Sequence, residues 1–153
     1  MAKLWDKGFE INAEIEKYTV GRDRELDLYL AQDDVLGSMA HITMLESIGL
    51  LEKDELTALL AQLKEIYAQA LQGDFEIEDG IEDVHSQVEL MLTRSLGEMG
   101  KKIHSGRSRN DQVLVDLRLF TRRQLRLIVE DVCSLFKELQ AQSERYKNVL
   151  MPG

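Results

Sequence analysis

Apolar side chains recur at spacings of three and four residues along most of the chain, which is the period of an α-helix. This pattern predicts four helices, over residues 23–48, 53–71, about 81–96 and about 108–148. Glycines stand where three of them should end, at Gly49, Gly73 and Gly97. The only proline is Pro152, and residues that favour strands rarely occur in runs. We therefore expect an all-α protein.

Three of the predicted helices carry an apolar face that we expect to be buried. In the first helix this face consists of Leu26, Leu30, Leu36, Met39, Ala40, Thr43 and Met44. In the second it consists of Leu56, Leu59, Leu60, Leu63, Ile66, Tyr67 and Ala70. In the third it consists of Val84, Val88, Met91, Leu92 and Leu96. We interpret the acidic segment 74–83 as an exposed turn and the segment 101–107 as a loop.

The last predicted helix is very long for a chain of 153 residues. About 40 residues at about 1.5 Å each give a rod of roughly 60 Å. Its apolar stripe consists of Val113, Leu117, Phe120, Leu127, Ile128, Val132, Leu135, Phe136, Leu139 and Tyr146. A chain of this size cannot cover such a rod, so the stripe predicts partner helices from other chains or from further sequence. We expect Cys133, on the same side, to be a core residue rather than a nucleophile.

Composition narrows the class of protein. Hydrophobic residues make up 44% of the chain and charged residues 31%, as in soluble globular proteins, and the length suffices for one domain with a core. No apolar run approaches the roughly 20 residues that span a bilayer, and the N-terminus has no apolar stretch of signal-peptide type. A single cysteine excludes a disulfide framework within the chain. We therefore expect a cytoplasmic protein that does not bind a membrane.

The charge is unevenly distributed. The net charge is -9, but the segment 101–111 carries four bases and one acid. An acidic chain is a poor ligand for nucleic acid, because phosphates repel it, so a small anion at the basic segment is the better expectation. In the stretch His104–Val113, arginines, serine hydroxyls and an amide gather at the predicted start of the last helix, where an anion can bind. The alternative is a solvated loop in which Ser108 caps the helix.

Two further stretches combine residues that can carry chemistry. His85 and Glu89 are spaced i, i+4 and could share a metal or a proton, although a hydrogen-bonded histidine in the first turn of a helix is the simpler interpretation. With three histidines in the chain and no second ligand pair, we predict no metal site. In the stretch Asp34–His41, Gly37 and Ala40 indicate a close contact between helices.

The stretch Lys102–Val113 resembles the first signature region of the argininosuccinate lyase family, with the core Gly-Arg-Ser-Arg-Asn-Asp intact at residues 106–111. The resemblance extends over essentially the whole chain, through the segments Lys3–Trp5, Asp34–His41, Glu82–His85 and Met151–Gly153. The core motif is specific for this family within the wider fumarase/aspartase superfamily.

The resemblance implies an all-α fold, with residues 1–103 as an N-terminal helical domain. Residues 104–153 would be the signature loop and the first long helix of a central bundle, which is incomplete here. It implies a carbon–nitrogen lyase of arginine biosynthesis that eliminates fumarate from argininosuccinate and releases arginine, without a cofactor or metal. In that chemistry a base removes a proton beside a carboxylate, oxyanion donors hold the carbanion, and the guanidinium leaves. It also implies a homotetramer that assembles through the long helix.

The resemblance further implies two groups of site residues. The substrate would be bound by Ser108, Arg109, Asn110 and His85. These would be supported by Arg107, Asp83 and Ser105. No catalytic residue is carried over, because the chain resembles about the first third of the enzyme, and we expect it to be inactive alone. A substrate-contacting serine of the family is not carried over either, since Asp23 occupies its place.

Two other interpretations stay open. The same family includes crystallins that keep the fold without needing the activity, so the chain could be a non-catalytic assembly module. The intact cluster 108–110 favours the enzyme, because a structural module has no need for an anion-binding cluster there. A related lyase acting on fumarate, aspartate or adenylosuccinate fits the sequence of residues 106–111 less well.

Overall fold

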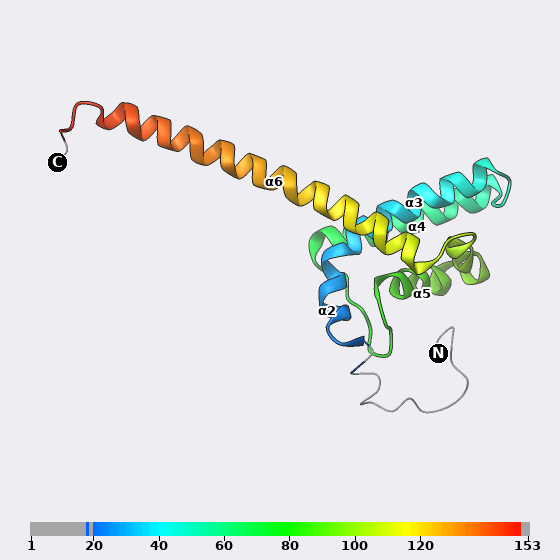
Figure 1. The fold of residues 1–153 in the computed structure, drawn as a ribbon. Coiled ribbons are helices and arrows are strands. Elements are labelled where there is room, and N and C mark those ends of the chain that lie inside the picture. Colours follow the sequence, from blue (N-terminus) through cyan, green and yellow to red (C-terminus); the bar gives the residue numbers. More distant parts are fainter. Residues whose placement is uncertain (1–17, 19, 151–153) are drawn as a thin grey trace. The chain divides into compact units, whose positions relative to one another are not determined.

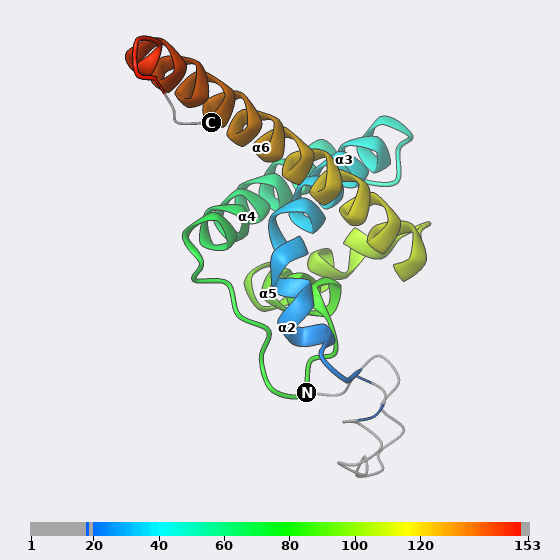
Figure 2. The ribbon, with the colours of Figure 1, turned by 60° about the vertical axis from the view of Figure 1, so that its left-hand side comes forward.

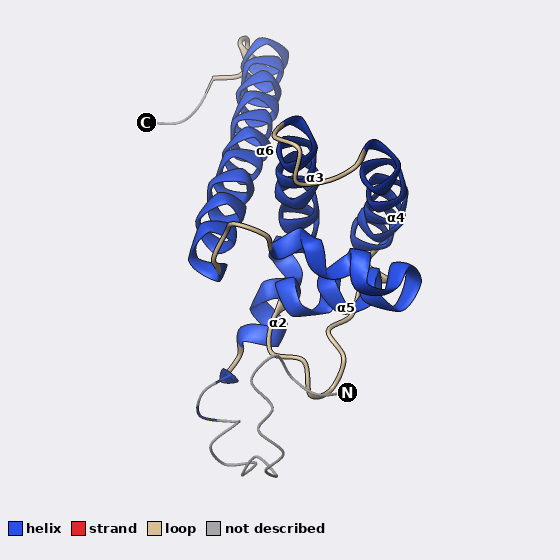
Figure 3. Cartoon of the chain, turned by 90° about the vertical axis from the view of Figure 1, so that its right-hand side faces the viewer, coloured by secondary structure: helices blue, strands red, loops and turns tan. Residues whose placement is uncertain are grey.

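The computed structural model describes residue 18 and residues 20–150, and every regular element within these residues is a helix (Figure 3). The predicted all-α fold is therefore confirmed. Two segments of the family resemblance, Lys3–Trp5 and Met151–Gly153, lie outside the described residues. The chain divides into two compact units, Met1–Leu117 and Arg118–Gly153. The domain boundary expected after residue 103 stays a prediction.

The first unit holds a set of short and medium helices and the start of the longest one. Helices α3 and α4 run side by side, and a long connection leads from α4 to α5 (Figure 1). The elements in chain order are α2 (Asp23–Asp27), the 3₁₀ helix η1 (Leu28–Leu30), α3 (Ala31–Ser47), α4 (Lys53–Gln72), α5 (Val84–Leu96), the 3₁₀ helix η2 (Gly97–His104) and α6 (Arg109–Tyr146).

Helix α4 follows the sequence prediction closely. It begins with a reciprocal capping box between Glu52 and Glu55, in which the Glu52 N–H donates to Glu55 Oε2 at 3.1 Å. It ends at Gly73, whose φ of 82° lies in the left-handed region that glycine adopts without a steric penalty. Its predicted apolar face is confirmed, because every member is buried or packs against the core. The core of the first unit contains Ala31, Val35, Ile42, Leu45, Leu51, Leu59, Leu63, Ile66, Phe75, Val84, Val88, Leu92 and Ile103.

The buried face predicted for the first helix is wrong. The η1 segment separates α2 from α3, so the predicted continuous helix is interrupted. Helix α3 packs through a different face from the predicted one, and Leu36 and Met44 are exposed. The buried face of α3 includes two polar residues, Asp34 and Ser38, which a search for apolar periodicity passes over.

The two segments expected to be irregular are more ordered than predicted. Phe75, in the supposed exposed turn, is buried in the core. The first part of the segment expected to be a loop, residues 101–104, belongs to the 3₁₀ helix η2, which packs on α5, whereas residues 105–107 form no helix. A Cβ on Gly100 would lie only 2.5 Å from the backbone nitrogen of Thr93, so only glycine allows this approach.

Helix α6 spans 38 residues, which confirms the predicted long rod. In the second unit, Arg118–Gly153, eight of its apolar residues are between 47% and 60% exposed, namely Leu125, Leu127, Ile128, Val129, Val132, Leu135, Phe136 and Leu139. Cys133 is exposed as well in the single chain, and its expected place in a core with partner helices stays a prediction. A single helix cannot bury its own apolar face. Among the described residues, no helix combines the length and the apolar character needed to cross a membrane.

Candidate functional site

Carboxylates from two elements hold the start of α5. Asp83 is the N-cap residue, and its Oδ1 accepts a hydrogen bond from the Ser86 N–H at 2.8 Å. Helix α2 lies against the same turn (Figure 2), where Asp27 Oδ2 accepts from the Val84 N–H at 3.2 Å. Burial raises the pKa of Asp27, although this hydrogen bond acts in the opposite direction. The two carboxylates fix the first turn of α5, which carries His85 and Ser86.

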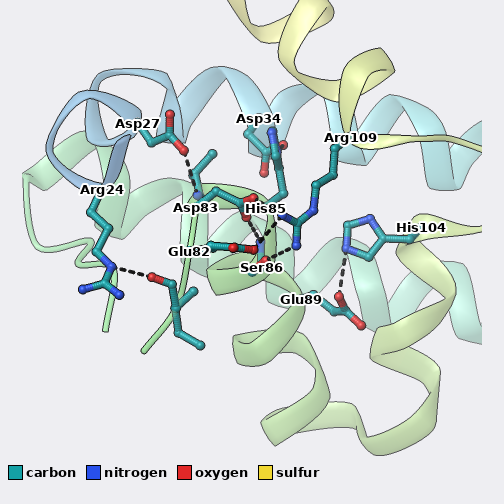
Figure 4. Close-up of polar contacts among 12 residues, drawn as sticks. Arg24, Asp27, Asp34, Glu82, Asp83, His85, Ser86, Glu89, His104 and Arg109 are labelled. Atoms are coloured by element: carbon teal, nitrogen blue, oxygen red, sulfur yellow. Dashed lines mark hydrogen bonds and ion pairs between the residues drawn. The ribbon is translucent and has the colours of Figure 1, made fainter. Parts of the chain in front are cut away.

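Arg109, the first residue of α6, reaches this turn (Figure 4). Its Nη1 lies 2.8 Å from Asp83 Oδ2 and 3.1 Å from Glu82 Oε2, and its Nη2 donates to Ser86 Oγ at 3.1 Å. The structure thus brings together Arg109 and Asp83, which the sequence assigned to substrate binding and to support. The two stretches lie far apart in the sequence, so only the fold creates this contact.

The stretch Asp34–His41, also singled out in the sequence, contacts the signature loop that leads into α6. Arg107 Nη2 donates to Ser38 Oγ of α3 at 2.9 Å, and its Nε donates to the Ile103 carbonyl at 3.2 Å. His41 Nε2 donates to the Ser105 carbonyl at 2.8 Å. Burial lowers the pKa of Arg107, while nearby carboxylates act in the opposite direction. Both predicted supporting residues of the signature loop therefore connect it to α3.

Ser108 and Asn110, two predicted substrate-binding residues, are exposed at the start of α6. Ser108 Oγ accepts from the Asp111 N–H at 3.4 Å, which confirms the predicted cap. In return, Asp111 Oδ2 accepts from the Ser108 N–H at 2.7 Å and from its hydroxyl at 2.9 Å. These hydrogen bonds lower the pKa of Asp111. The serine hydroxyl is therefore engaged within the chain.

Acids of the chain already compensate the basic segment. Lys101 Nζ lies 2.6 Å from Glu98 Oε1, and Lys102 pairs with Glu55. Arg109 has its two acidic partners before α5. These ion pairs are at least partly exposed, and such pairs contribute only about 0–1 kcal/mol each. An incoming anion must compete for the positive charges, but the competition is weak.

A buried polar cluster adjoins these residues. His85 Nδ1 lies 2.7 Å from Asp34 Oδ1 of α3 and 3.8 Å from Asp116 Oδ2 of α6. Oδ2 of Asp34 and Oδ2 of Asp116 are buried without a hydrogen-bond partner in the part of the chain that is described. Gly37 leaves room for this approach, because a Cβ there would lie 3.3 Å from Val115 Cγ1. The predicted close helix contact is therefore confirmed at Gly37.

Burial and mutual charge shift the protonation of this cluster. Burial, reinforced by the charge of Asp34, raises the pKa of Asp116 to about 7. Burial alone would lower the pKa of His85, but the hydrogen bond and charge of Asp34 outweigh it, and the pKa is raised. Both groups therefore tend to keep their protons up to neutral pH.

Comparison with known proteins shows the family to which the chain belongs. The sequence profile of a family described as "Lyase" matches residues 11–153. The chain belongs to this lyase family. An argininosuccinate lyase of Bacteroides fragilis is 72% identical over 151 residues, which is 99% of this chain. Argininosuccinate lyases of Thermotoga neapolitana and Methylococcus capsulatus are 40% and 43% identical over 99% of the chain.

The chain spans about a third of these relatives, 34%, 38% and 32% of their respective lengths. The family resemblance seen in the sequence is confirmed. In the structure, the signature residues 106–111 meet the Glu82–His85 segment through Arg109 and meet α3 through Arg107.

The hypothesis that His85 and Glu89 share a metal ion is not supported by the structure. Glu89 Oε2 lies 3.0 Å from His104 Nε2, whereas His85 hydrogen-bonds to Asp34, so the simpler interpretation of a hydrogen-bonded histidine is confirmed. Within the described residues, the set that could geometrically hold a metal ion is Asp34, His85 and Asp116, whose ligand atoms lie within 4.8 Å of one another.

The sequence analysis did not single out Asp116. A signal was present, because Arg109, Gln112 and Asp116 recur at spacings of three and four and form a polar face on an otherwise apolar-striped helix. Gln112 and Asp116 are both almost fully buried. A buried polar face of this kind indicates a specific partner, here the first turn of α5.

Proposed function

We propose that this lyase chain supplies the N-terminal third of an argininosuccinate lyase, which splits argininosuccinate into arginine and fumarate in the cytoplasm. The relatives named above support this function. The observation that carries it is the contact of Arg109 with Ser86 and Asp83, which holds a guanidinium where α5 and α6 both begin. We expect no cofactor and no nucleic-acid partner, the latter because a net charge of -9 repels phosphate.

In this proposal the substrate's carboxylate is held by Arg109 together with Ser108 and Asn110. Arginine binds carboxylates with two parallel hydrogen bonds, and the first N–H groups of α6 have no partner within the helix. Asp83 would keep the guanidinium in place between turnovers. His85, only 3% exposed, would line the site from behind Ser86.

The base and the oxyanion donors of the elimination would come from sequence outside this chain. We therefore propose that the chain alone forms no fumarate from argininosuccinate. A chain extended by the remaining sequence of the Bacteroides fragilis relative should be active. Its rate of fumarate formation, measured by ultraviolet absorbance, tests the proposal.

Arg109→Ala in the extended chain tests the site directly. Loss of one charge-assisted contact of about 1.5–3 kcal/mol should lower kcat/KM by roughly 10- to 100-fold. The matched control is Arg94→Ala, which removes an arginine of α5 that pairs with Glu78. An unchanged kcat/KM in Arg109→Ala would remove this arginine from the substrate site, and fumarate production by the chain alone would refute the assignment of the base.

We also propose a homo-oligomer, a tetramer in the family, that assembles through α6. The exposed apolar residues of the second unit support this, because exposed patches of that kind mark interfaces. Light scattering should reveal association at micromolar concentration. Val132→Glu should abolish it, whereas Glu130→Gln should not. A monomeric wild type over a wide concentration range would contradict the proposal.

The second candidate is a non-catalytic assembly module. One observation favours it, namely that Lys101, Lys102 and Arg109 are all paired with acids of the same chain. Titration with succinate, followed by NMR, discriminates between the two. The enzyme predicts amide shifts over residues 105–111 at millimolar succinate, and the module predicts none.

A further inference from the structure

Asp34 of α3, His85 of α5 and Asp116 of α6 are each almost fully buried and meet in the first unit. Only one hydrogen bond joins them, between His85 Nδ1 and Asp34 Oδ1. The Oδ2 atoms of the two carboxylates receive no donor from any described residue. A buried carboxylate oxygen without a donor is unfavourable when the group is ionised, so the cluster requires a compensating proton or cation.

Negative groups outnumber positive ones around His85. The positive groups are His85 itself, Arg107, which precedes α6, and Arg109, which pairs with Asp83. The acids that act on His85 or Asp116 are Asp27 of α2, Asp33 and Asp34 of α3, Asp83 at the start of α5, and Asp116 of α6. An added proton reduces this excess without moving any heavy atom.

A divalent cation would also reduce the excess, but the geometry favours protons. The 2.7 Å between His85 Nδ1 and Asp34 Oδ1 is a hydrogen-bond length. The proton of that bond occupies the nitrogen lone pair that a metal ion would need. Arg107 already brings one permanent positive charge close to both carboxylates.

The helix that carries Asp116 also carries Arg109. Seven residues separate them, about two helical turns, so both lie on one face of α6 with the buried Gln112 between them. Arg109 bonds to Ser86, and Asp116 lies beside His85, the residue before Ser86. Two residues of α6 that are two turns apart therefore both contact the first turn of α5.

We propose that Asp34 and Asp116 are positioning residues: Asp34 holds His85 doubly protonated, the protonated Asp116 packs beside it, and together they keep Ser86 and Arg109 in contact at the start of α5 and α6. The pKa of Asp116, raised to about 7 by burial and by Asp34, gives this cluster a limit near neutral pH. Above that limit Asp116 ionises, its unpartnered oxygen carries charge, and the contact between α5 and α6 weakens. Only the role given to the Ser86–Arg109 contact, which is to hold Arg109 for the substrate's carboxylate, rests on the proposed function.

The test is an NMR titration of the chain labelled with ¹⁵N. Its three histidine rings are assigned by the loss of one signal set in His85→Gln. We expect the His85 ring to lose its second proton only above the pH at which an ordinary histidine titrates, and to lose it at a lower pH in Asp34→Asn than in the wild type. The amide shifts of Ser86 and Arg109 should follow a transition near pH 7 in the wild type and lose it in Asp116→Asn. Asp131→Asn, an exposed carboxylate on the same helix, should change neither.

Three results would overturn the proposal. One is a His85 ring that is already neutral well below pH 7 in the wild type, a measurement that needs no variant to fold. Another is a Ser86 and Arg109 response that is unchanged in Asp116→Asn. The third is a stoichiometric shift of the His85 signals on adding Zn²⁺, which would assign the cluster to a metal instead. None of these readouts depends on activity, so a failure of the argininosuccinate lyase assay would leave them standing.

Discussion

Ionisation of Asp116 should make the first unit less stable as the pH rises. The pKa of Asp116 is about 7 in the folded chain, because of burial and the charge of Asp34, against about 3.9 in an unfolded chain. A raised pKa means that the contribution to stability is complete below about pH 4 and is lost progressively as the pH approaches about 7. The full shift corresponds to about 4 kcal/mol, of which about 3 kcal/mol is lost between pH 5 and pH 8.

Asp116→Asn removes this titration and keeps a side chain of nearly the same shape. Relative to the variant, the wild type's free energy of unfolding should therefore fall by about 3 kcal/mol between pH 5 and pH 8. Burial acts to lower the pKa of His85, but Asp34 outweighs it and the pKa is raised. The contribution of His85 is also lost as the pH rises, in wild type and variant alike, so it largely cancels in the comparison.

Urea unfolding followed by far-ultraviolet circular dichroism at the two pH values measures this difference. The slope of free energy against urea must be the same in both proteins for the comparison to hold. Asp131→Asn, which removes an exposed carboxylate from α6, should follow the wild type at both pH values. Parallel pH curves for the wild type and Asp116→Asn would refute the raised pKa and the reasoning built on it.

Two further predictions concern packing in the first unit. Gly100→Ala should destabilise it by about 2–3 kcal/mol, because the new Cβ would lie 2.5 Å from the Thr93 nitrogen. Glu98→Ala, an exposed change in the same 3₁₀ helix, should cost under about 0.5 kcal/mol. Equal unfolding midpoints of the two variants in urea would contradict this. Leu63→Ala, at a fully buried position, should cost about 3–5 kcal/mol, while Leu71→Ala on the exposed end of the same helix should cost little; similar losses in thermal unfolding would show that Leu63 is not a core residue.

The sequence alone determined the helical class, the extent of α4 and the long rod of α6. These elements have a regular apolar period, a glycine such as Gly73 at the end, or a cap such as Ser108 at the start. Such signals are local, because each depends on residues only a few positions apart in the sequence. The family resemblance likewise depends on a short motif, residues 106–111, which needs no tertiary structure to be recognised.

Only the tertiary structure decided which face of α3 is buried and which polar residues meet. Periodicity favoured Leu36 and Met44 as core residues, but α3 packs on α4 and α5 through the face that carries Asp34, so Leu36 and Met44 are exposed. The partners of Asp34 are 51 and 82 residues away, at His85 and Asp116. No local pattern encodes such contacts, because a buried charge is tolerated only where other parts of the chain bring a proton or an opposite charge to it.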